Sequence, residues 1–77
     1  MSAPKFKTLD VRPLIARGEE PFSAIRTAVD RLAVGQGLTV IAPFLPAPLI
    51  ERLKGEGFAS AIEPRPGGAW AVNFWKE

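Results

Sequence analysis

The feature that most constrains this chain is that its 77 residues contain no cysteine and no histidine. A chain of this length buries only about 60% of the surface that it exposes when unfolded, so many small domains add disulfides or a structural zinc ion. This sequence lacks the side chains that build either one. The domain must therefore close a hydrophobic core unaided, from the 47% of its residues that are apolar.

The same absence excludes whole classes of chemistry. Thiol chemistry, redox exchange and acid–base catalysis by histidine all need side chains that the chain lacks. Its eight Asp and Glu residues are scattered and would at best hold a hard cation. Neither Ser23 nor Ser60 has an activating partner in the sequence. We therefore expect a non-enzymatic protein with no catalytic residue, no metal and no cofactor.

The charge pattern predicts a mixed, solvated surface. Ten Lys and Arg against eight Asp and Glu leave a net charge of +2, and the basic residues are scattered among the acidic ones without forming a run. A nucleic-acid interface is usually a basic stripe on one face. The first ten residues lack the apolar segment of a signal peptide, and no apolar run approaches the roughly 18 residues of a membrane span. We expect one cytoplasmic domain over residues 1–77, with its core from about residue 6 to 75.

Prolines and glycines divide the chain into short elements. The expected strands are Phe6 to Val11, Leu38 to Ala42, Phe58 to Glu63 and Ala69 to Trp75. Arg12 is expected to stay extended, because the residue before a proline is pushed out of the helical region. Prolines suit the first turn of a helix, so helices are expected to begin at Pro21 and Pro48.

The first of these helices has the clearer pattern. Its apolar residues recur at helical spacing, namely Phe22, Ile25, Val29 and Leu32. Arg26 and Asp30 are spaced to pair on its polar face. Gly35 is the expected left-handed stop of this helix, and Gly55 or Gly57 that of the second.

The resulting order, β-α-β-α-β-β, predicts an α+β fold. Right-handed crossovers make the first two strands parallel, and the last two form a hairpin. Two short helices cover one face of a mixed four-stranded sheet, and the other face stays partly open. In the last strand, Trp70 falls on one face and Trp75 on the other. The predicted architecture is a two-layer α/β sandwich.

Several of these residues resemble the TusA/SirA-like sulfur-carrier family. The resemblance lies in Leu9-Asp10-Val11-Arg12, in Pro21 opening an amphipathic helix, and in the strand from Leu38 to Ile41. That family implies the same two-layer fold and a persulfide-carrying cysteine at the start of the first helix. Counting back from Pro21 puts Gly18 at the cysteine position and Glu19 at that of a proline. The resemblance therefore implies the fold without the family's sulfur chemistry.

The second half resembles the uncharacterised, cysteine-poor relatives of TusA. It carries Pro46-Ala47-Pro48-Leu49-Ile50 and a terminal pattern of Gly68, Trp70, Val72 and Phe74. Such relatives occur alone or fused to other domains, including hemerythrin-like ones. The resemblance spans roughly residues 8–75 and implies no established activity.

The first candidate binding region is the loop from Arg12 to Pro21. Amide groups at a helix N-terminus attract anions, and Arg12 and Arg17 would add charged contacts around Gly18 and Glu19. The alternative is that Arg12 pairs with a neighbouring carboxylate and only holds the loop in place. We weight this second interpretation more heavily, because Glu19 and Glu20 would repel an anion.

The second candidate region is the apolar loop Pro43 to Pro48. Loops are usually polar, so Phe44 and Leu45 indicate a partner surface or the rim of a small cleft. The alternative, favoured for Phe44 and Trp70, is that they tuck over the ends of the sheet. Trp75 is expected to line the open face, where an aromatic ring could stack on a base.

The leading hypothesis is a binding module for a protein partner or small ligand, present as a monomer or weak homodimer and without a membrane partner. A nucleic-acid-binding domain is the alternative, since the sequence pI is about 9.5. A docking accessory in sulfur relay or redox metabolism, with no chemistry of its own, is the third.

Overall fold

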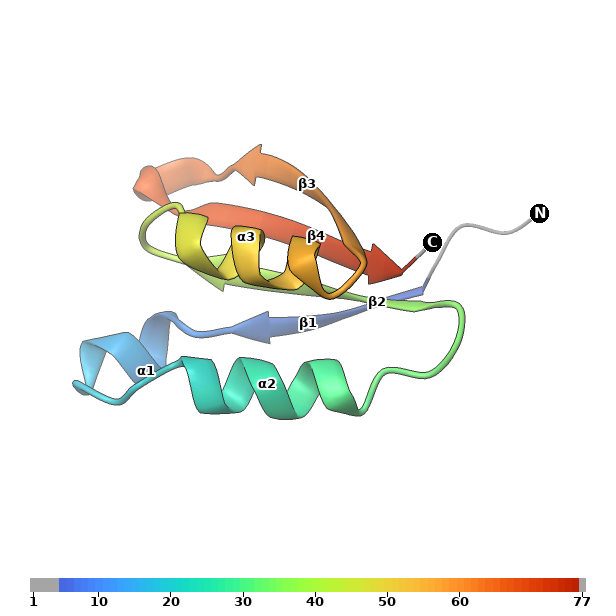
Figure 1. Ribbon diagram of the computed structural model, residues 1–77. Coiled ribbons are helices and arrows are strands. Elements are labelled where there is room, and N and C mark those ends of the chain that lie inside the picture. The colour runs from blue at the N-terminus through green and yellow to red at the C-terminus, as the bar shows by residue number, and fades with distance from the viewer. Residues whose placement is uncertain (1–4, 77) are drawn as a thin grey trace.

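A four-stranded mixed sheet forms one layer of the molecule (Figure 1). The computed structural model describes residues 5–76. Its strands are β1 (Lys5–Asp10), β2 (Gln36–Ala42), β3 (Phe58–Pro64) and β4 (Trp70–Lys76). They lie in the order β1-β2-β4-β3, with β1 and β2 parallel and the other two pairs antiparallel. The predicted parallel pair and the C-terminal hairpin are both confirmed.

Helices α2 (Phe22–Asp30) and α3 (Ala47–Gly55) form the second layer, and both pack on the same face of the sheet (Figure 1). A short helix α1 (Arg12–Ala16) precedes α2, and a 3₁₀ turn η1 (Pro66–Gly68) joins β3 to β4. The expected α+β fold, a two-layer sandwich with a mixed sheet, is confirmed. The expected domain limits, residues 1–77, include residues 1–4 and 77, which lie outside the described part of the chain.

The core lies between the sheet and the two helices. Alternate residues of the central strands point toward the helices, and they are almost fully buried: Leu38, Val40, Ala42, Val72 and Phe74. The helices meet them with Ile25 and Val29 from α2 and Leu49 and Leu53 from α3. The period of two in the strands and of about 3.6 in the helices places these residues on facing sides. One continuous apolar cluster therefore holds both layers together.

The opposite face of the sheet carries no helix within residues 5–76. A buried polar side chain on this face is Thr39, which is 7% exposed and donates to the Asn73 amide oxygen at 2.6 Å. The Asn73 amide nitrogen in turn donates to the Glu63 carboxylate at 3.0 Å. At one end of this face the rings of Phe6 and Trp75 meet edge to face, 6.1 Å apart. Trp75 thus lies on the open face, as predicted.

The structure corrects the prediction that Arg12 is extended. Arg12 is the first residue of α1. The Asp10 carboxylate accepts its backbone N–H at 3.0 Å, and Pro13 lies in the first turn, where its missing N–H has no helical partner. Leu14 and Ile15 pack against the core. This packing outweighs the local restriction on the residue before a proline.

The structure also corrects the end of the first long helix. It ends at Asp30 rather than near Gly35, and Arg31 caps it in an ordinary right-handed conformation. Gly35 has a φ of 82° and forms the turn into β2, which begins at Gln36. The other element ends agree with the predictions to within the usual one or two residues.

Candidate functional site

An apolar pocket of about 230 Å³ opens at the end of the sheet where the strands β1 and β2 finish. Carboxyl ends of parallel strands meet at such an end, which is where open α/β sheets place their ligand sites. We call it the proline pocket after three of its lining residues. Its wall consists of Val11, Ile15, Pro21, Phe22, Ile25, Val40, Ala42, Phe44, Pro46, Pro48 and Leu49. None of these side chains carries a hydrogen-bonding group, so the pocket can hold only an apolar group.

The loop between β2 and α3 forms one wall of the proline pocket. Pro46 is buried at the N-cap of α3, and Pro48 lies in the first helical turn, where its missing N–H needs no partner. The Ala47 N–H donates to the Leu45 carbonyl at 2.9 Å, which tightens the turn. This loop leaves Phe44 and Leu45 on the surface, 50% and 40% exposed.

The expectation that Phe44 tucks away over the end of the sheet is therefore wrong. The ring lines the pocket with one side and faces solvent with the other. Pro43 and Pro46 restrict the backbone on either side of it, so the loop has little freedom to fold the ring inward. Trp70, for which the same placement is expected, is partly exposed.

The opposite wall comes from α1 and the start of α2. Gly18 has a φ of 75°, which lets the chain turn sharply between the two helices. Phe22 is 49% exposed and, like Phe44, lines the pocket. Helical spacing predicts that Phe22 lies on the buried side of the helix, but the structure places it on the pocket rim. The signal that could have revealed this is its position in the first turn, beyond the end of the sheet.

The N-terminus of α2 already has an acidic partner. The Glu20 carboxylate accepts the backbone N–H groups of Phe22 and Ser23 and the Ser23 hydroxyl, the last at 2.8 Å. The hydrogen bond from Ser23 is the main reason that the pKa of Glu20 is lowered. These contacts occupy the amides that an external anion would need.

The two arginines of this region are paired as well. Arg12 and Asp10 form a fork of hydrogen bonds, with Nη2 to Oδ2 at 2.7 Å and Nε to Oδ1 at 2.9 Å. Arg17 Nε lies 2.6 Å from a Glu19 carboxylate oxygen. Hydrogen bonds from the arginines lower the pKa of Asp10 and of Glu19. This geometry fits the interpretation in which Arg12 holds the loop, while a binding role of Arg12, Arg17, Gly18 and Glu19 stays a prediction.

Trp75 lies apart from the other candidate residues. It pairs with Gly37 near the start of β2, whereas the proline pocket lies where β2 ends. The structure therefore brings the α1–α2 segment and the Pro43–Pro48 loop together and leaves Trp75 at the other end of the sheet.

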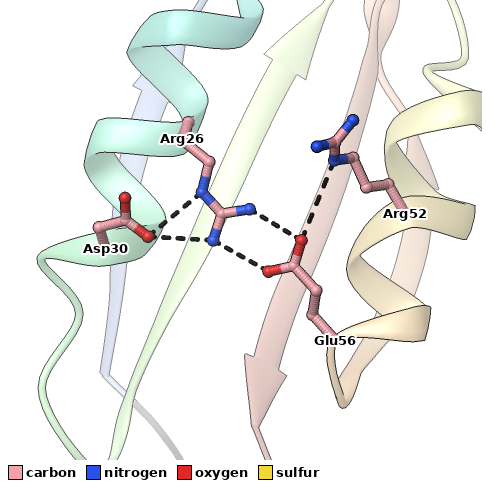
Figure 2. A network of polar contacts seen from close by, with 4 residues as sticks. All are labelled: Arg26, Asp30, Arg52 and Glu56. Carbon is pink, nitrogen blue, oxygen red and sulfur yellow. Dashed lines mark hydrogen bonds and ion pairs between the residues drawn. The ribbon is translucent and has the colours of Figure 1, made fainter.

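An ionic network joins α2 to the end of α3 (Figure 2). Arg26 contacts Glu56 through two hydrogen bonds of 2.8 and 2.9 Å and Asp30 at 3.0 Å. Arg52 lies 4.0 Å from the same Glu56 carboxylate. The predicted Arg26–Asp30 pair is confirmed, but Glu56 is 30 residues away in the sequence and no local pattern indicates it. The hydrogen bond to Glu56 is the main cause that raises the pKa of Arg26, and the one from Arg26 lowers that of Glu56.

Among residues 5–76, no three His, Cys, Asp or Glu side chains are grouped so that they could hold a metal ion. Over the same residues, no helix has the length and apolar composition needed to cross a bilayer.

Residues 8–76 match the family model described as an uncharacterized conserved protein, DUF2249. No curated protein and no solved structure matches the chain.

Proposed function

The chain belongs to the DUF2249 family of uncharacterized conserved proteins, and from this premise we propose that it is a non-enzymatic binding module. Its proline pocket receives one bulky apolar side chain of a partner protein. The observation that carries the proposal is the wall of the pocket, in which no side chain offers a hydrogen bond or a charge.

The size of the pocket favours a partner's side chain over a free small molecule. Small-molecule sites usually have volumes of about 300–1,000 Å³ and include a few polar groups that orient the ligand. The proline pocket has about 230 Å³ and no polar side chain. A single aromatic or branched side chain inserted into a dry pocket is instead the usual anchor of a protein interface.

The rim supplies the rest of such an interface. Phe22, Phe44 and Leu45 are the large exposed apolar side chains near the pocket. Exposed apolar groups gathered at one place indicate an interaction surface, whereas single ones scattered over a surface do not. A partner segment that crosses this rim would bury all three.

The placement of charge weighs against the nucleic-acid alternative. By the strand register, Asp10 and Glu63 lie on the open face at the opposite end from the aromatic pair. Lys5, Lys7 and Lys76 fall on the face that carries the helices. The aromatic rings therefore lack the flanking cations that hold a phosphate backbone. Binding of single-stranded DNA that weakens with salt would revive this alternative.

We include the TusA/SirA resemblance in the proposal, as a scaffold that keeps a docking surface without sulfur chemistry. The position expected for the carrier cysteine is Gly18, which lies between α1 and α2 at the same end of the sheet as the pocket. The cytoplasm is the proposed location.

The test is an NMR titration of the isotope-labelled protein with N-acetyl-tryptophan amide and N-acetyl-leucine amide. We expect saturable shifts in the millimolar range, confined to residues of the proline pocket. Phe44→Ser should abolish them. The matched control is Val34→Ser, which changes another exposed apolar side chain outside the pocket wall and should leave the shifts intact. Shifts that survive Phe44→Ser, or no saturable shifts at all, would overturn the proposal.

A further inference from the structure

Strand β3 has one free edge. The sheet order β1-β2-β4-β3 leaves β1 and β3 at its two edges, and no other segment within residues 5–76 pairs with the outer side of β3. From Ser60 to Pro64 every residue of this strand is exposed. A row of unpaired backbone N–H and C=O groups is a template for another strand.

The side chains of β3 do little to block such pairing. Edge strands are usually protected by charged residues, prolines or bulges within the strand. The centre of β3 reads Ala59-Ser60-Ala61-Ile62, which is small or apolar, and its proline comes only at the last position. The one charged side chain, Glu63, bonds to Asn73 of its own sheet at 3.0 Å. The carboxylate therefore turns inward, away from the free edge.

The other edge strand, β1, carries positively charged side chains. Lys5 and Lys7 are exposed there, and Lys7 lies near the middle of the strand. Two copies of β1 paired about that position would bring like charges together, which destabilises a strand pair. Of the two edges, β3 is thus the one suited to a second strand.

We propose that β3 pairs antiparallel with β3 of a second copy of this chain, about a two-fold axis at Ala61. Because Ala61 is the central residue of β3 (Phe58–Pro64), the register places Ala61 opposite its own copy and Ser60 opposite Ile62. Ile62, 47% exposed in the single chain, then approaches Ile62 and Phe58 of the other copy diagonally. Directly opposed residues share a face, so both helical layers lie on the same side of one continuous eight-stranded sheet.

This register sets no like charges directly opposite one another, since Glu63 faces Ala59. It is also self-complementary, as a two-fold interface requires. Strand pairing of seven residues buries far less than the roughly 1,200–2,000 Å² of a stable interface. The dimer is therefore weak and depends on protein concentration. A covalent cross-link between the two copies is needed to detect it.

The chain has no native cysteine, so a single introduced cysteine can form a disulfide only with its copy in another chain. In Ala61→Cys, the two introduced thiols lie opposite each other on the axis, and mild oxidation should link them. Ser60→Cys is the matched control, because the register places its two thiols diagonally, near or beyond the roughly 7 Å Cα separation that a disulfide can bridge. Thr8→Cys, exposed on the other edge strand, and Glu51→Cys, exposed on α3, report random collision.

We expect Ala61→Cys to form disulfide-linked dimer at least tenfold faster than each of the three controls at 100 µM protein. Adding Ile62→Lys to Ala61→Cys should reduce the rate to that of the controls, because two lysines then meet across the edge. Circular dichroism verifies that each variant is folded. Equal rates for Ala61→Cys and Thr8→Cys would overturn the pairing, and equal rates for Ala61→Cys and Ser60→Cys would overturn its register. Neither result bears on the proline pocket, none of whose wall belongs to β3.

Discussion

The substitution Gly37→Ala tests how tightly the open face of the sheet is built. A Cβ atom at Gly37 would lie 2.4 Å from a carbon of the Phe6 ring and 2.7 Å from the backbone carbonyl oxygen of Phe74. The ring can rotate away, since Phe6 is partly exposed. The carbonyl belongs to β4, which pairs with β2 at this position, so it can yield only if the two central strands shift.

The expected loss of stability follows from two opposing terms. Overpacking a well-packed site costs about 1–3 kcal/mol. Replacing a glycine with alanine restores about 0.5–1 kcal/mol by restricting the unfolded chain. We therefore expect Gly37→Ala to lower the free energy of unfolding by about 1–2 kcal/mol. For a domain of this size, that corresponds to a fall in Tm of roughly 5–15 °C.

Urea denaturation followed by circular dichroism measures this change. Gly55→Ala is the matched control, because nothing lies within 4 Å of its Cβ position and it should be neutral or stabilising. The double variant Phe6→Ala/Gly37→Ala separates the two obstacles. If only the ring stands in the way, Gly37→Ala costs nothing in the Phe6→Ala background. We expect most of the loss to remain, and a Gly37→Ala protein as stable as the wild type would refute the reasoning.

Two further predictions concern the core and the ionic network. Leu38→Ala should cost about 2–5 kcal/mol in urea denaturation, because Leu38 is 1% exposed within the core, whereas the exposed Val34→Ala should cost little. Glu56→Gln should lower Tm at pH 7 by removing the link from α3 to Arg26. Because contact with Arg26 lowers the pKa of Glu56 when folded, its contribution is present above the unfolded pKa, near 4.3, and is lost as pH falls through the folded pKa. The Tm gap between Glu56→Gln and wild type should therefore narrow from pH 6 to pH 3, and a gap that stays constant would contradict this.

Local patterns in the sequence predicted the sheet and both long helices. Apolar residues such as Val72 and Phe74 recur at every second position of a strand, and Ile25 and Val29 recur at helical spacing. Both signals arise from burial on one side of an element, and the structure buries those residues. The short helix α1 gave no such signal, because its five residues make little more than one turn and Pro13 argues locally against it.

The pocket was partly predictable because it depends on topology. If the first two strands are parallel, the segments that follow them meet at one edge, which brings Phe44 close to the start of α2. Contacts between side chains distant in sequence were beyond prediction. Glu56 reaches Arg26 only because α2 and α3 lie side by side on the same face of the sheet. The distance between the two helices depends on how the core packs beneath them.

The exposed apolar residues connect stability with the two proposed surfaces. Fully burying a large apolar side chain stabilises a fold by about 1.5–3 kcal/mol, and a small domain has a narrow margin of stability. Within residues 5–76, six large hydrophobic side chains are nonetheless exposed: Phe6, Phe22, Val34, Phe44, Leu45 and Ile62. Phe6 packs on Trp75, three of the others surround the proline pocket, and Ile62 lies on the free edge of β3. Phe6 and Val34 lie outside the two proposed surfaces. The other four are exposed where a partner or a second copy would bury them, so binding would recover stabilisation that the single chain lacks.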